Sequence, residues 1–405
     1  MLSLFSMDPF DLNLRHLHAL RHVAEHGSMT SASVAAGMSQ PALTQGLARM
    51  ERTLGVTLFE RRPEGARFTD AGRVLAERAQ AAIDHLEAAA RDAFRGGSRG
   101  FARPVGLMTS TQLRAFLSVA DAGSFVGASA ETGLSEPALH RAVRDLEQIC
   151  GTALAERRGR GIQFTAPGRR LARGVRLAAA ELIAARIELD PQGREVAQIV
   201  VGTMPLARAR VLPKAIAGFV RADRKIPVKV IEGSWRELVE PLRDGVIDMM
   251  IGAMRAEITD DLAQEPLFED ELAIVARAGH PLASGPPSLG ELASFDWIVS
   301  APGTPLREHW DHMFAGRAPP SCMVECGSTM VIRGVLEDSD LLTLLSPDQV
   351  TMELAANSLI VISGPPSGVV RRVGLVTRAG WRPTAAQASF IDYLKEAATK
   401  VPKKL

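Results

Sequence analysis

The basic side chains in the first half of the chain are the groups with the most evident chemistry. The 405-residue chain has no lysine before Lys214, and residues 1–190 carry 24 arginines against 20 acidic residues. A guanidinium is planar and forms paired hydrogen bonds with a phosphate or with the edge of a guanine. The remaining residues have 23 basic and 26 acidic side chains, so the basic excess lies at the front. A genome that favours arginine codons would give the same pattern and is an equal alternative.

Histidine and cysteine positions give only weak indications of a metal site. Four histidines are clustered near the N-terminus: His16, His18, His22 and His26. The last three are spaced to share one face of a helix, which we interpret as a solvated face. Cys322 and Cys326 have three residues between them and no second pair nearby, so structural zinc is not expected. The chain is predicted to need no metal and no other cofactor.

The sequence lacks the motifs that would supply a catalyst. It contains no Walker phosphate loop, no dinucleotide-binding glycine signature after a strand, no nucleophile elbow and no H-E-x-x-H. We therefore predict that the protein is not an enzyme.

Composition is typical of a soluble globular protein with several domains. Hydrophobic residues make up 46% of the chain, charged residues 23%, and the formal net charge is +1. Three cysteines are too few for a disulfide framework, which favours a reducing compartment and hence the cytoplasm. No apolar run reaches the length of a membrane span, and the start of the chain lacks the basic region of a signal peptide, so no membrane association is expected.

An internal repeat organises the first half of the chain. A shift of 96 residues aligns residues 17–73 with 113–169 without a gap, and 24 of these 57 positions are identical. Both copies keep G-S, S-x-P-A-L, E-R-R and F-T-x-x-G-R in the same order. We interpret this pattern as a duplication.

Each copy is predicted to contain three short helices and a two-stranded wing. In the first copy Ser28 and Ser39 are predicted to cap the second and third helices, with Pro41 in the first turn of the third. A capped helix after a tight turn is helix-turn-helix geometry, in which the third helix enters the major groove by its N-terminal residues. The segment TLFERRPEGARFTDAG predicts the wing. We place the two winged helix-turn-helix domains at residues 13–73 and 113–168.

The first copy resembles the DNA-binding segment of LysR-type transcriptional regulators. The resemblance lies in the run S-Q-P-A-L-T-Q-x-L-x-x-M-E-x-x-L-G-V-x-L-F-E-R, followed by F-T-x-A-G. It implies base contacts from Gln40, Thr44 and Gln45. It implies phosphate contacts from four further residues: Arg49, Arg61, Arg62 and Thr69. Free N–H groups at the helix start, around Ser39 and Pro41, can also hold a phosphate. For the two wing arginines, Arg61 and Arg62, a solvated wing is the alternative.

The second copy departs from this pattern at the positions implied to contact DNA. Glu136, His140 and Arg141 replace Gln40, Thr44 and Gln45. Glu136 can accept a hydrogen bond from cytosine and Arg141 can pair with guanine, so we favour a second DNA reader. A decayed copy kept for packing is the alternative, because the carboxylate of Glu136 also repels phosphate.

Two other features of the second copy bear on its binding to DNA, one favouring it and one opposing it. Residues 157–176 contain seven arginines and no acid, which favours phosphate binding. The remaining DNA-contact candidates are Ser135, Arg144, Arg157, Arg158, Arg160 and Thr165. Ala155 stands where Phe59 would anchor the first wing, so the second wing is expected to be looser by about a few kcal/mol.

A long helix is predicted after each wing, at residues 74–94 and 169–190. The apolar positions of the two helices share one register: Leu75, Ala79, Ala82, Leu86, Ala89 and Ala93 in the first, and Leu171, Val175, Ala178, Leu182, Ala185 and Leu189 in the second. Their spacing forms a coiled-coil seam that needs a partner helix. In the family this helix pairs two subunits. Here the two helices could pair within one chain as an internal pseudo-dimer, or across subunits, and the link at 95–112 is expected to be flexible enough for both.

The remainder of the chain, residues 196–405, alternates short β-rich runs with helices of about ten residues, which predicts parallel βαβ units. It resembles the effector domain of the same family, a two-lobed fold like periplasmic solute-binding proteins. We assign lobe I to about 196–275 and 359–405, and lobe II to about 276–358. Within the family, this half looks most like the branch of galactose-binding-protein regulators and regulators of aromatic catabolism.

The effector is expected between the lobes, at the carboxyl ends of strands and the starts of helices. Hydroxyls and free N–H groups at helix starts suit a small anion such as a carboxylate, although each hydroxyl could equally be an ordinary helix cap. A sugar or an aromatic acid is equally compatible with the branch. The candidate residues are Thr203, Met204, Pro205, Ser234, Trp235, Gly252, Ala253, Gly303, Thr304 and Ser328.

The predicted fold is therefore two α-rich winged helix-turn-helix domains plus a two-lobed α/β effector domain. The resemblance implies a transcriptional regulator whose partners are double-stranded DNA, a small-molecule effector, further copies of itself as a dimer or tetramer, and RNA polymerase. An architectural DNA-binding protein without an effector is one alternative. An α/β enzyme with a DNA-binding front end is the other.

Overall fold

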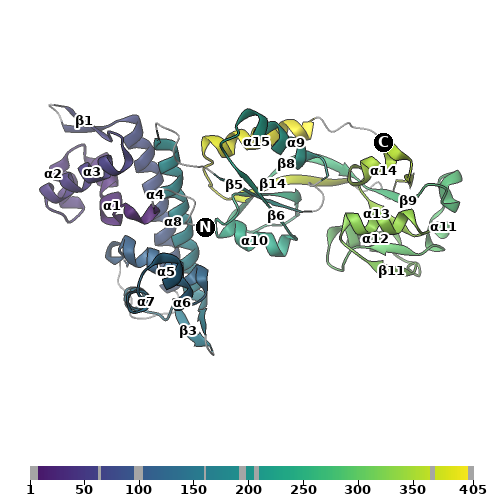
Figure 1. Ribbon diagram of the computed structural model, residues 1–405, viewed down its shortest axis with the longest axis horizontal. Coiled ribbons are helices and arrows are strands. Elements are labelled where there is room, and N and C mark those ends of the chain that lie inside the picture. The colour runs from purple at the N-terminus through teal and green to yellow at the C-terminus, as the bar shows by residue number, and fades with distance from the viewer. Residues whose placement is uncertain are drawn as a thin grey trace. The chain divides into compact units, whose positions relative to one another are not determined.

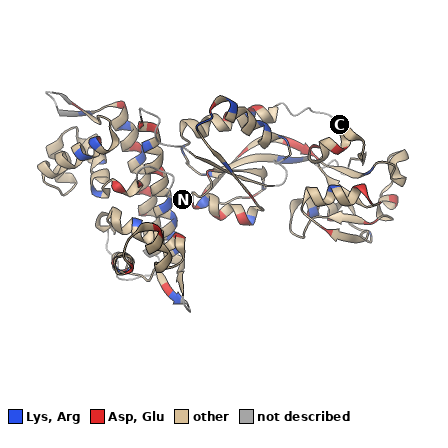
Figure 2. Ribbon diagram, in the orientation of Figure 1, with Lys and Arg blue, Asp and Glu red and all other residues tan. Residues whose placement is uncertain are grey.

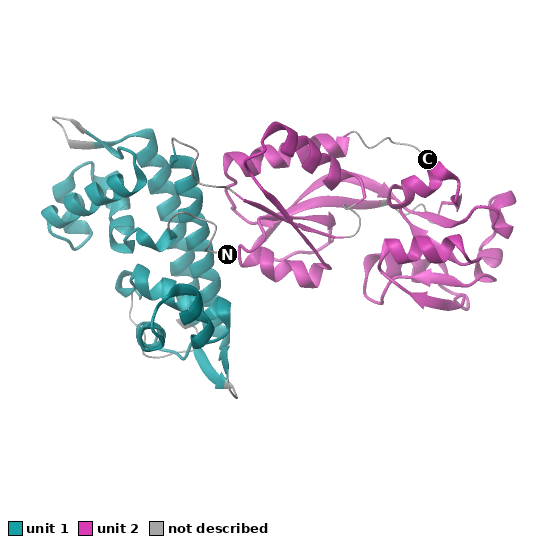
Figure 3. Ribbon diagram, viewed as in Figure 1, with its two compact units in different colours: residues 1–197 teal, residues 198–405 magenta. Residues whose placement is uncertain are grey.

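The computed structural model divides into two compact units, Met1–Ala197 and Gln198–Leu405 (Figure 3). It describes the chain over residues 8–62, 65–94, 104–158, 161–190, 198–204, 209–364 and 370–399. Each unit has its own hydrophobic core.

The first copy of the repeat folds as three helices and a wing, as its sequence predicts. Its elements are α1 (Leu14–His26), α2 (Met29–Ala35), α3 (Gln40–Leu54), β1 (Phe59–Arg62) and β2 (Gly65–Phe68) (Figure 1). Asn13, Ser28 and Ser39 cap the three helices through side-chain oxygens. Gly27 and Gly55 end α1 and α3 in the left-handed conformation that glycine adopts without strain.

The second copy repeats this order. Its elements are α5 (Ser110–Ala122), α6 (Phe125–Thr132), α7 (Glu136–Cys150), β3 (Ala155–Arg158) and β4 (Gly161–Phe164). The second wing has an aromatic contact although Ala155 replaces Phe59, and its expected loosening stays a prediction. In the first copy Phe59 packs on Phe68, with ring centroids 4.8 Å apart. In the second, Phe164 packs on Phe116, on the first helix of that copy, at 5.4 Å.

Each wing is pressed against the start of the long helix that follows it. The helices are α4 (Asp70–Phe94) and α8 (Ala166–Leu189). A Cβ atom on Gly72 would lie 2.2 Å from the carbonyl oxygen of Leu58, and one on Gly168 would lie 1.9 Å from that of Leu154. Only glycine fits these two positions, which explains why both copies keep it.

The two long helices pair with each other inside the chain. All twelve seam positions predicted from the sequence are buried. The helices run antiparallel, since Arg78 near the start of α4 contacts Glu188 near the end of α8, while Gly174 near the start of α8 lies against Ala89. Figure 1 shows α4 and α8 lying side by side next to the two copies. The structure therefore has the intrachain arrangement, the first of the two considered.

The expectation of a flexible link over 95–112 is wrong for its last part. A 3-10 helix, η3 (Pro104–Leu107), follows residues 95–103, which lie outside the described residues. Val105 and Met108 are buried, and Thr109 and Gln112 form a capping box that starts α5. These apolar contacts and the cap order residues 104–112 as part of the second copy.

The N-terminal residues brace the two copies together. A short 3-10 helix, η2 (Pro9–Asp11), buries Phe10, and Asp8 forms an ion pair with Arg114 of α5 at 2.9 Å. The backbone N–H of Leu14 donates to Ser110 Oγ at 3.0 Å, and that hydroxyl donates to Leu12 O at 2.8 Å. The start of α1 is thus joined to the start of α5.

The first lobe of the C-terminal unit is a five-stranded sheet in the order β6-β5-β7-β14-β8. Its strands are β5 (Ile199–Thr203), β6 (Val228–Glu232), β7 (Met249–Ala253), β8 (Leu262–Glu271) and β14 (Val370–Arg378), and its helices are α9 (Val211–Ala222), α10 (Trp235–Arg243) and α15 (Ala385–Thr399). β5, β6 and β7 are parallel, whereas β14 runs antiparallel to β7 and β8.

The second lobe is a five-stranded sheet in the order β11-β10-β12-β9-β13. Its strands are β9 (Ala273–Arg277), β10 (Trp297–Val299), β11 (Cys322–Glu325), β12 (Leu342–Leu345) and β13 (Leu359–Ser363). Its helices are α11 (Leu289–Ala293), α12 (Pro305–Met313), α13 (Thr329–Glu337) and α14 (Thr351–Ala356), with two 3-10 turns, η5 (Pro281–Ser284) and η6 (Pro347–Val350).

The expected lobe boundaries need correction. Residues 273–275 and 359–363 were assigned to lobe I, but both β9 and β13 pair within the second sheet. The chain therefore crosses between β8 and β9 and returns between β13 and β14. β8 itself was not expected, because its acidic, proline-containing sequence is unlike a buried strand; as the edge strand of its sheet it tolerates both features.

Asp248 gives the C-terminal unit a pH-dependent term in its stability. Burial raises the pKa of this carboxyl to about 6, against the opposing effect of the Val200 N–H, which donates to it at 2.7 Å. The folded pKa exceeds the unfolded value of 3.8, so the folded state binds this proton more tightly and stability falls as pH rises between these two values.

Replacing Asp248 with Asn should remove this loss of stability, because an amide does not ionise. The amide oxygen can still accept a hydrogen bond from the Val200 N–H. We expect Asp248→Asn to raise the free energy of unfolding at pH 7.5 by up to about 3 kcal/mol, and the gain to shrink towards pH 4.5. All four tryptophans lie after residue 198, so fluorescence during urea unfolding reports on this unit. The exposed Asp260→Asn is the control, and an equal gain at both pH values would contradict the assignment.

Candidate nucleic-acid interface and effector site

The start of α3 presents an exposed polar face. Ser39 accepts a hydrogen bond from the backbone N–H of Ala42 at 3.4 Å, so its oxygen holds the first turn. Gln40, Pro41, Gln45 and Arg49 are exposed and Thr44 is half-buried. Leu43, Leu47 and Met50 are buried on the opposite face. The helix thus points its predicted base-reading residues to solvent while its apolar side packs on the domain.

The start of α7 presents a different polar face. Glu136, Arg141 and Arg144 are exposed, and Ser135 makes no side-chain capping bond. His140 is half-buried, with its ring packed at a tilt against Phe125 of α6 at a centroid distance of 3.5 Å. The exposed charged groups of this helix start are therefore a carboxylate and guanidinium groups.

The wings place basic residues beyond the helices. Arg157 is exposed on β3, and Figure 2 shows basic residues near the tip of this second wing. Arg61 and Arg62 lie in β1 and Arg158 in β3. Arg160 lies outside the described residues.

Glu51 and Glu147 join α3 and α7 to their wings, a role that the sequence did not predict. Glu51 Oε1 accepts from the backbone N–H groups of Leu58 and Phe59 at 2.7 and 3.3 Å. Glu147 Oε1 accepts from the equivalent groups of Leu154 and Ala155 at 2.9 and 3.2 Å. A carboxylate that accepts two N–H groups fixes the angle between helix and wing. The available signal was that both copies keep glutamate at this position.

Two residues predicted to contact DNA serve as helix caps. Thr69 Oγ1 accepts from Gly72 N–H at 3.0 Å and donates to Thr57 O at 2.7 Å, which caps α4. Thr165 does the same for α8 with Gly168 and Ala153. Their hydroxyls therefore join each wing to its long helix.

One group of possible metal ligands lies at the end of α1. The donor atoms of His22, Glu25 and His26 lie within 4.8 Å of one another. Glu25 already accepts from Arg21 at 2.7 Å, and the group lies at the surface. A solvated face stays our interpretation.

The predicted effector residues of β5 and β7 pack on each other. Thr203 is fully buried and donates to Met204 O at 3.2 Å. Met204 covers Gly252 so closely that a Cβ atom there would lie 1.8 Å from its methyl group. Ala253 is half-buried beside them, and Pro205 lies outside the described residues.

The predicted effector residues at helix starts make local hydrogen bonds. Ser234 Oγ donates to Glu237 at 2.7 Å, and Thr304 Oγ1 donates to Ala301 O at 2.8 Å and accepts from Arg307 N–H at 3.3 Å. Gly303 precedes that cap in an exposed turn. Trp235 lies under the guanidinium of Arg255, 4.6 Å from its ring centroid. Ser328 is exposed and makes no side-chain capping bond, so its hydroxyl does not serve α13.

A buried polar cluster that the sequence did not indicate joins the two lobes. Arg371 of β14 pairs with Asp270 of β8, and Ser346 of the second lobe donates to the same carboxylate at 2.5 Å. Gln349 Nε2 donates to Thr329 Oγ1 at 3.2 Å. Arg371 and Gln349 are 6% and 8% exposed, and Arg371 Nε and Gln349 Oε1 are among the few buried polar atoms of the described residues without a hydrogen-bond partner.

Further charged groups lie near this cluster. Arg210, at the start of α9, pairs with Asp348 of η6 at 3.1 Å. Burial lowers the pKa of His309 on α12, and the nearby positive charge of Arg371 lowers it further.

Among the described residues, no helix has the length and apolar character needed to cross a membrane.

Two protein families match this chain. The family described as bacterial regulatory helix-turn-helix protein, lysR family, matches twice, at residues 14–73 and 110–169. The family described as LysR substrate binding domain matches residues 192–399. The two matches to the first family coincide with the two copies of the repeat.

Individual proteins show the same similarity. The chain is 32% identical to the transcriptional regulator GalR of Pseudomonas putida over 392 residues, which covers 96% of this chain and 98% of GalR. It is 28% identical to the regulator PcaQ of Agrobacterium fabrum over 294 residues, or 71% of this chain and 94% of PcaQ. Among solved structures, ArgP from Mycobacterium tuberculosis superposes with a TM-score of 0.60 at 18% identity, over 73% of this chain and 98% of ArgP. The similarity to GalR therefore includes both copies.

Removing the carboxylate of Glu147 should release the second wing. We expect Glu147→Ala to lower the free energy of unfolding of the N-terminal unit by about 2 kcal/mol, because two partly buried N–H groups lose a charged acceptor. Hydrogen exchange measured by NMR should show lost protection at Leu154 and Ala155. Glu156→Ala, an exposed acid on the same wing, is the control, and unchanged protection in Glu147→Ala would disprove the role.

Proposed function

Because the chain belongs to the LysR family of bacterial transcriptional regulators, we propose that it reads its promoter with both winged helices and responds to a small molecule held between the lobes of its C-terminal unit. The family assignment makes it a DNA-binding regulator with an effector-binding domain. The observation that carries the finer proposal is the pair of family-matched helix starts, each with an exposed polar face and a buried apolar one.

In the first copy we assign base reading to Gln40, Thr44 and Gln45. The amide of an exposed glutamine can pair with an adenine in the major groove. Arg49 on α3 and the wing residues Arg61 and Arg62 are assigned to phosphates, whose contacts position a protein without selecting sequence.

In the second copy we assign base reading to Glu136 and Arg141. Their exposure supports contact with cytosine and guanine, respectively. His140 is a weaker candidate, since its ring packs against Phe125. Arg144, Arg157 and Arg158 are assigned to phosphates.

One chain therefore carries a complete pair of readers. The antiparallel packing of α4 on α8 and the contact between the starts of α1 and α5 relate the two copies as the subunits of a dimer would be related. Paired helix-turn-helix units read half-sites about 34–36 Å apart, or a multiple of that spacing. We propose that a single chain spans two such half-sites.

For the effector we propose a small carboxylate bound at the buried cluster of Arg371, Gln349 and Thr329, close to the predicted Ser328. Arg371 Nε would donate to the carboxylate and Gln349 Oε1 would accept from a donor on the same molecule. A buried polar atom without a partner is costly, and a ligand that satisfies it gains that free energy. The cluster lies where the chain passes between the lobes, so its occupancy can alter their relation.

Self-association is proposed through the C-terminal units. The sheet-edge strands β6 and β11 and the helices α9 and α13 carry exposed apolar side chains: Val220, Val230, Met323, Met330 and Val331. Exposed apolar residues on edge strands favour pairing with a second copy. Contact with RNA polymerase at the promoter stays a prediction from the family. The cytoplasmic location, predicted from the few cysteines, and the lack of catalytic activity, predicted from the absent motifs, also stay predictions.

Base reading and phosphate contact predict different mutant behaviour. Gln45→Ala should weaken binding to the preferred duplex by roughly 1–3 kcal/mol and leave random DNA almost unchanged. Arg157→Ala should weaken both alike and lower the slope of affinity against salt by about 1. Fluorescence anisotropy with both duplexes at several salt concentrations measures this, and equal losses on both duplexes for Gln45→Ala would contradict its role.

The effector assignment predicts a loss of ligand response without loss of folding. A panel of small mono- and dicarboxylates should contain a compound that raises the melting temperature of the full chain by mass action. Gln349→Leu should keep the unliganded melting temperature and lower the affinity for that compound at least about tenfold. Gln264→Leu, in the first lobe, is the control. An unchanged shift in Gln349→Leu would place the effector elsewhere.

A further inference from the structure

The contact between α4 and α8 is not symmetric, although the repeat relates the two helices. Residues of the second copy exceed their equivalents in the first by 96, so Arg78 corresponds to Gly174, His85 to Glu181 and Asp92 to Glu188. Leu14 contacts Ser110, its own equivalent, as expected where a pseudo-two-fold axis passes. Both ends of the helix pair would therefore be alike if the sequences were alike.

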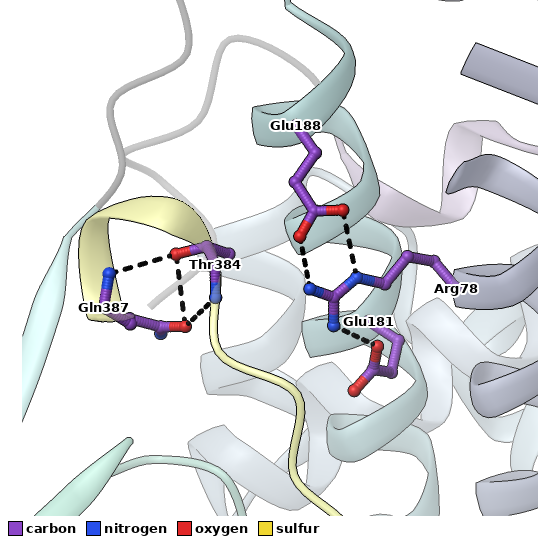
Figure 4. Close-up of polar contacts among 5 residues, drawn as sticks. All are labelled: Arg78, Glu181, Glu188, Thr384 and Gln387. Carbon is purple, nitrogen blue, oxygen red and sulfur yellow. Dashed lines mark hydrogen bonds and ion pairs between the residues drawn. The ribbon is translucent and has the colours of Figure 1, made fainter. Parts of the chain in front are cut away.

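One end of the pair buries a charged cluster. Arg78 is 1% exposed, and its guanidinium donates to Glu181 Oε2 at 2.8 Å and, through Nε, to Glu188 Oε2 at 3.4 Å (Figure 4). A second nitrogen of Arg78 pairs with Glu188 Oε1. Two carboxylates thus face one guanidinium between the helices.

The other end is closely packed instead. A Cβ atom on Gly174 would lie 2.3 Å from the Cβ of Ala89 and 2.8 Å from the carbonyl oxygen of His85. The helices therefore approach too closely at this end for any side chain larger than glycine. The interface has one wide, charged end and one narrow end without a side chain at position 174.

These two ends discriminate between pairing partners. If α8 paired with α8 of a second chain in this register, Gly174 would replace Arg78 opposite Glu181 and Glu188, and both ends would bury acids without this guanidinium. If α4 paired with another α4 in this register and at this helix separation, Arg78 would stand at both ends, including the one with no room for a Cβ atom. Only the unlike pair satisfies both charge and size.

We propose that Arg78, Glu181, Glu188 and Gly174 select the pairing of unlike helices, so that every pair of readers joins one α3 to one α7 and recognises two half-sites of different sequence. This inference rests on the proposed function, because it takes both helices to be DNA readers. Like pairing would join identical readers and predict an inverted repeat.

Reversing the charges of the buried cluster in the full-length chain tests whether they select the partner helix. Arg78→Glu should lower the melting temperature of the N-terminal unit by roughly 10 °C, since three acids are then buried together. The triple variant Arg78→Glu, Glu181→Arg, Glu188→Arg should regain more than half of that loss. Arg91→Glu, on the exposed face of α4, is the matched control. A triple variant as unstable as Arg78→Glu, or a loss no greater than in Arg91→Glu, would overturn the proposal.

Selecting binding sites from random duplexes tests whether the chain recognises two half-sites of different sequence. The wild-type chain should select two different half-sites. The variant Glu136→Gln, His140→Thr, Arg141→Gln, which gives α7 the reading residues of α3, should select an inverted repeat of one half-site. An inverted repeat selected by the wild-type chain, or an unchanged site in the variant, would overturn this inference and leave DNA reading intact. Failure of the wild-type chain to select any sequence would instead contradict the proposed function.

Discussion

The packing of α4 against α8 is the constraint on which the N-terminal unit depends. Each winged domain is fixed to its long helix by a threonine cap and by a glycine that admits the wing, so the relation between the two helices sets the relation between the two winged domains. The seam supplies apolar burial along the full length of both helices. Removing one member of the buried ion cluster would cost about 3–5 kcal/mol, a large share of the stability of a domain.

The repeat separates the positions that maintain the fold from those that carry specificity. Glu51 and Glu147, Gly72 and Gly168, and Thr69 and Thr165 make the same contacts in both copies. The exposed residues at the starts of α3 and α7 differ in charge and in hydrogen-bonding groups. Buried geometry has been kept while exposed chemistry has diverged, which supports the proposal of two readers that share one scaffold and contact different bases.

Periodicity and capping predicted most of the helices and strands, because these signals are local. The seam residues of α4 and α8 and the caps at Ser28 and Ser39 were all identifiable from spacing alone. Contacts between distant residues were not. Phe164 packs on Phe116 and not on the residue equivalent to Phe59. Arg78 pairs with acids more than 100 residues away in the sequence. No pattern within either helix indicates such partners.

At the candidate effector site of the C-terminal unit, too, the sequence did not predict the contacts between distant residues. Hydroxyls at helix starts were natural candidates, but Ser234 and Thr304 bond within their own turns, since a nearby backbone partner costs little entropy to hold. Among the described residues, two of the buried polar atoms without a partner belong to Arg371 and Gln349, and Arg371 is joined to the second lobe only through Asp270 and Ser346, a contact that forms after both lobes have folded.

A duplication within one chain removes a restriction that a homodimer cannot avoid. In a homodimer any change in the reading helix appears in both half-sites, so the operator must stay symmetric. In this chain each copy can change alone, but only if like copies are prevented from pairing. A symmetric seam would permit like pairing, since the apolar registers of α4 and α8 are the same. An interface with one guanidinium and one glycine at equivalent positions breaks that symmetry, so the freedom of α7 to diverge from α3 depends on residues far from the DNA.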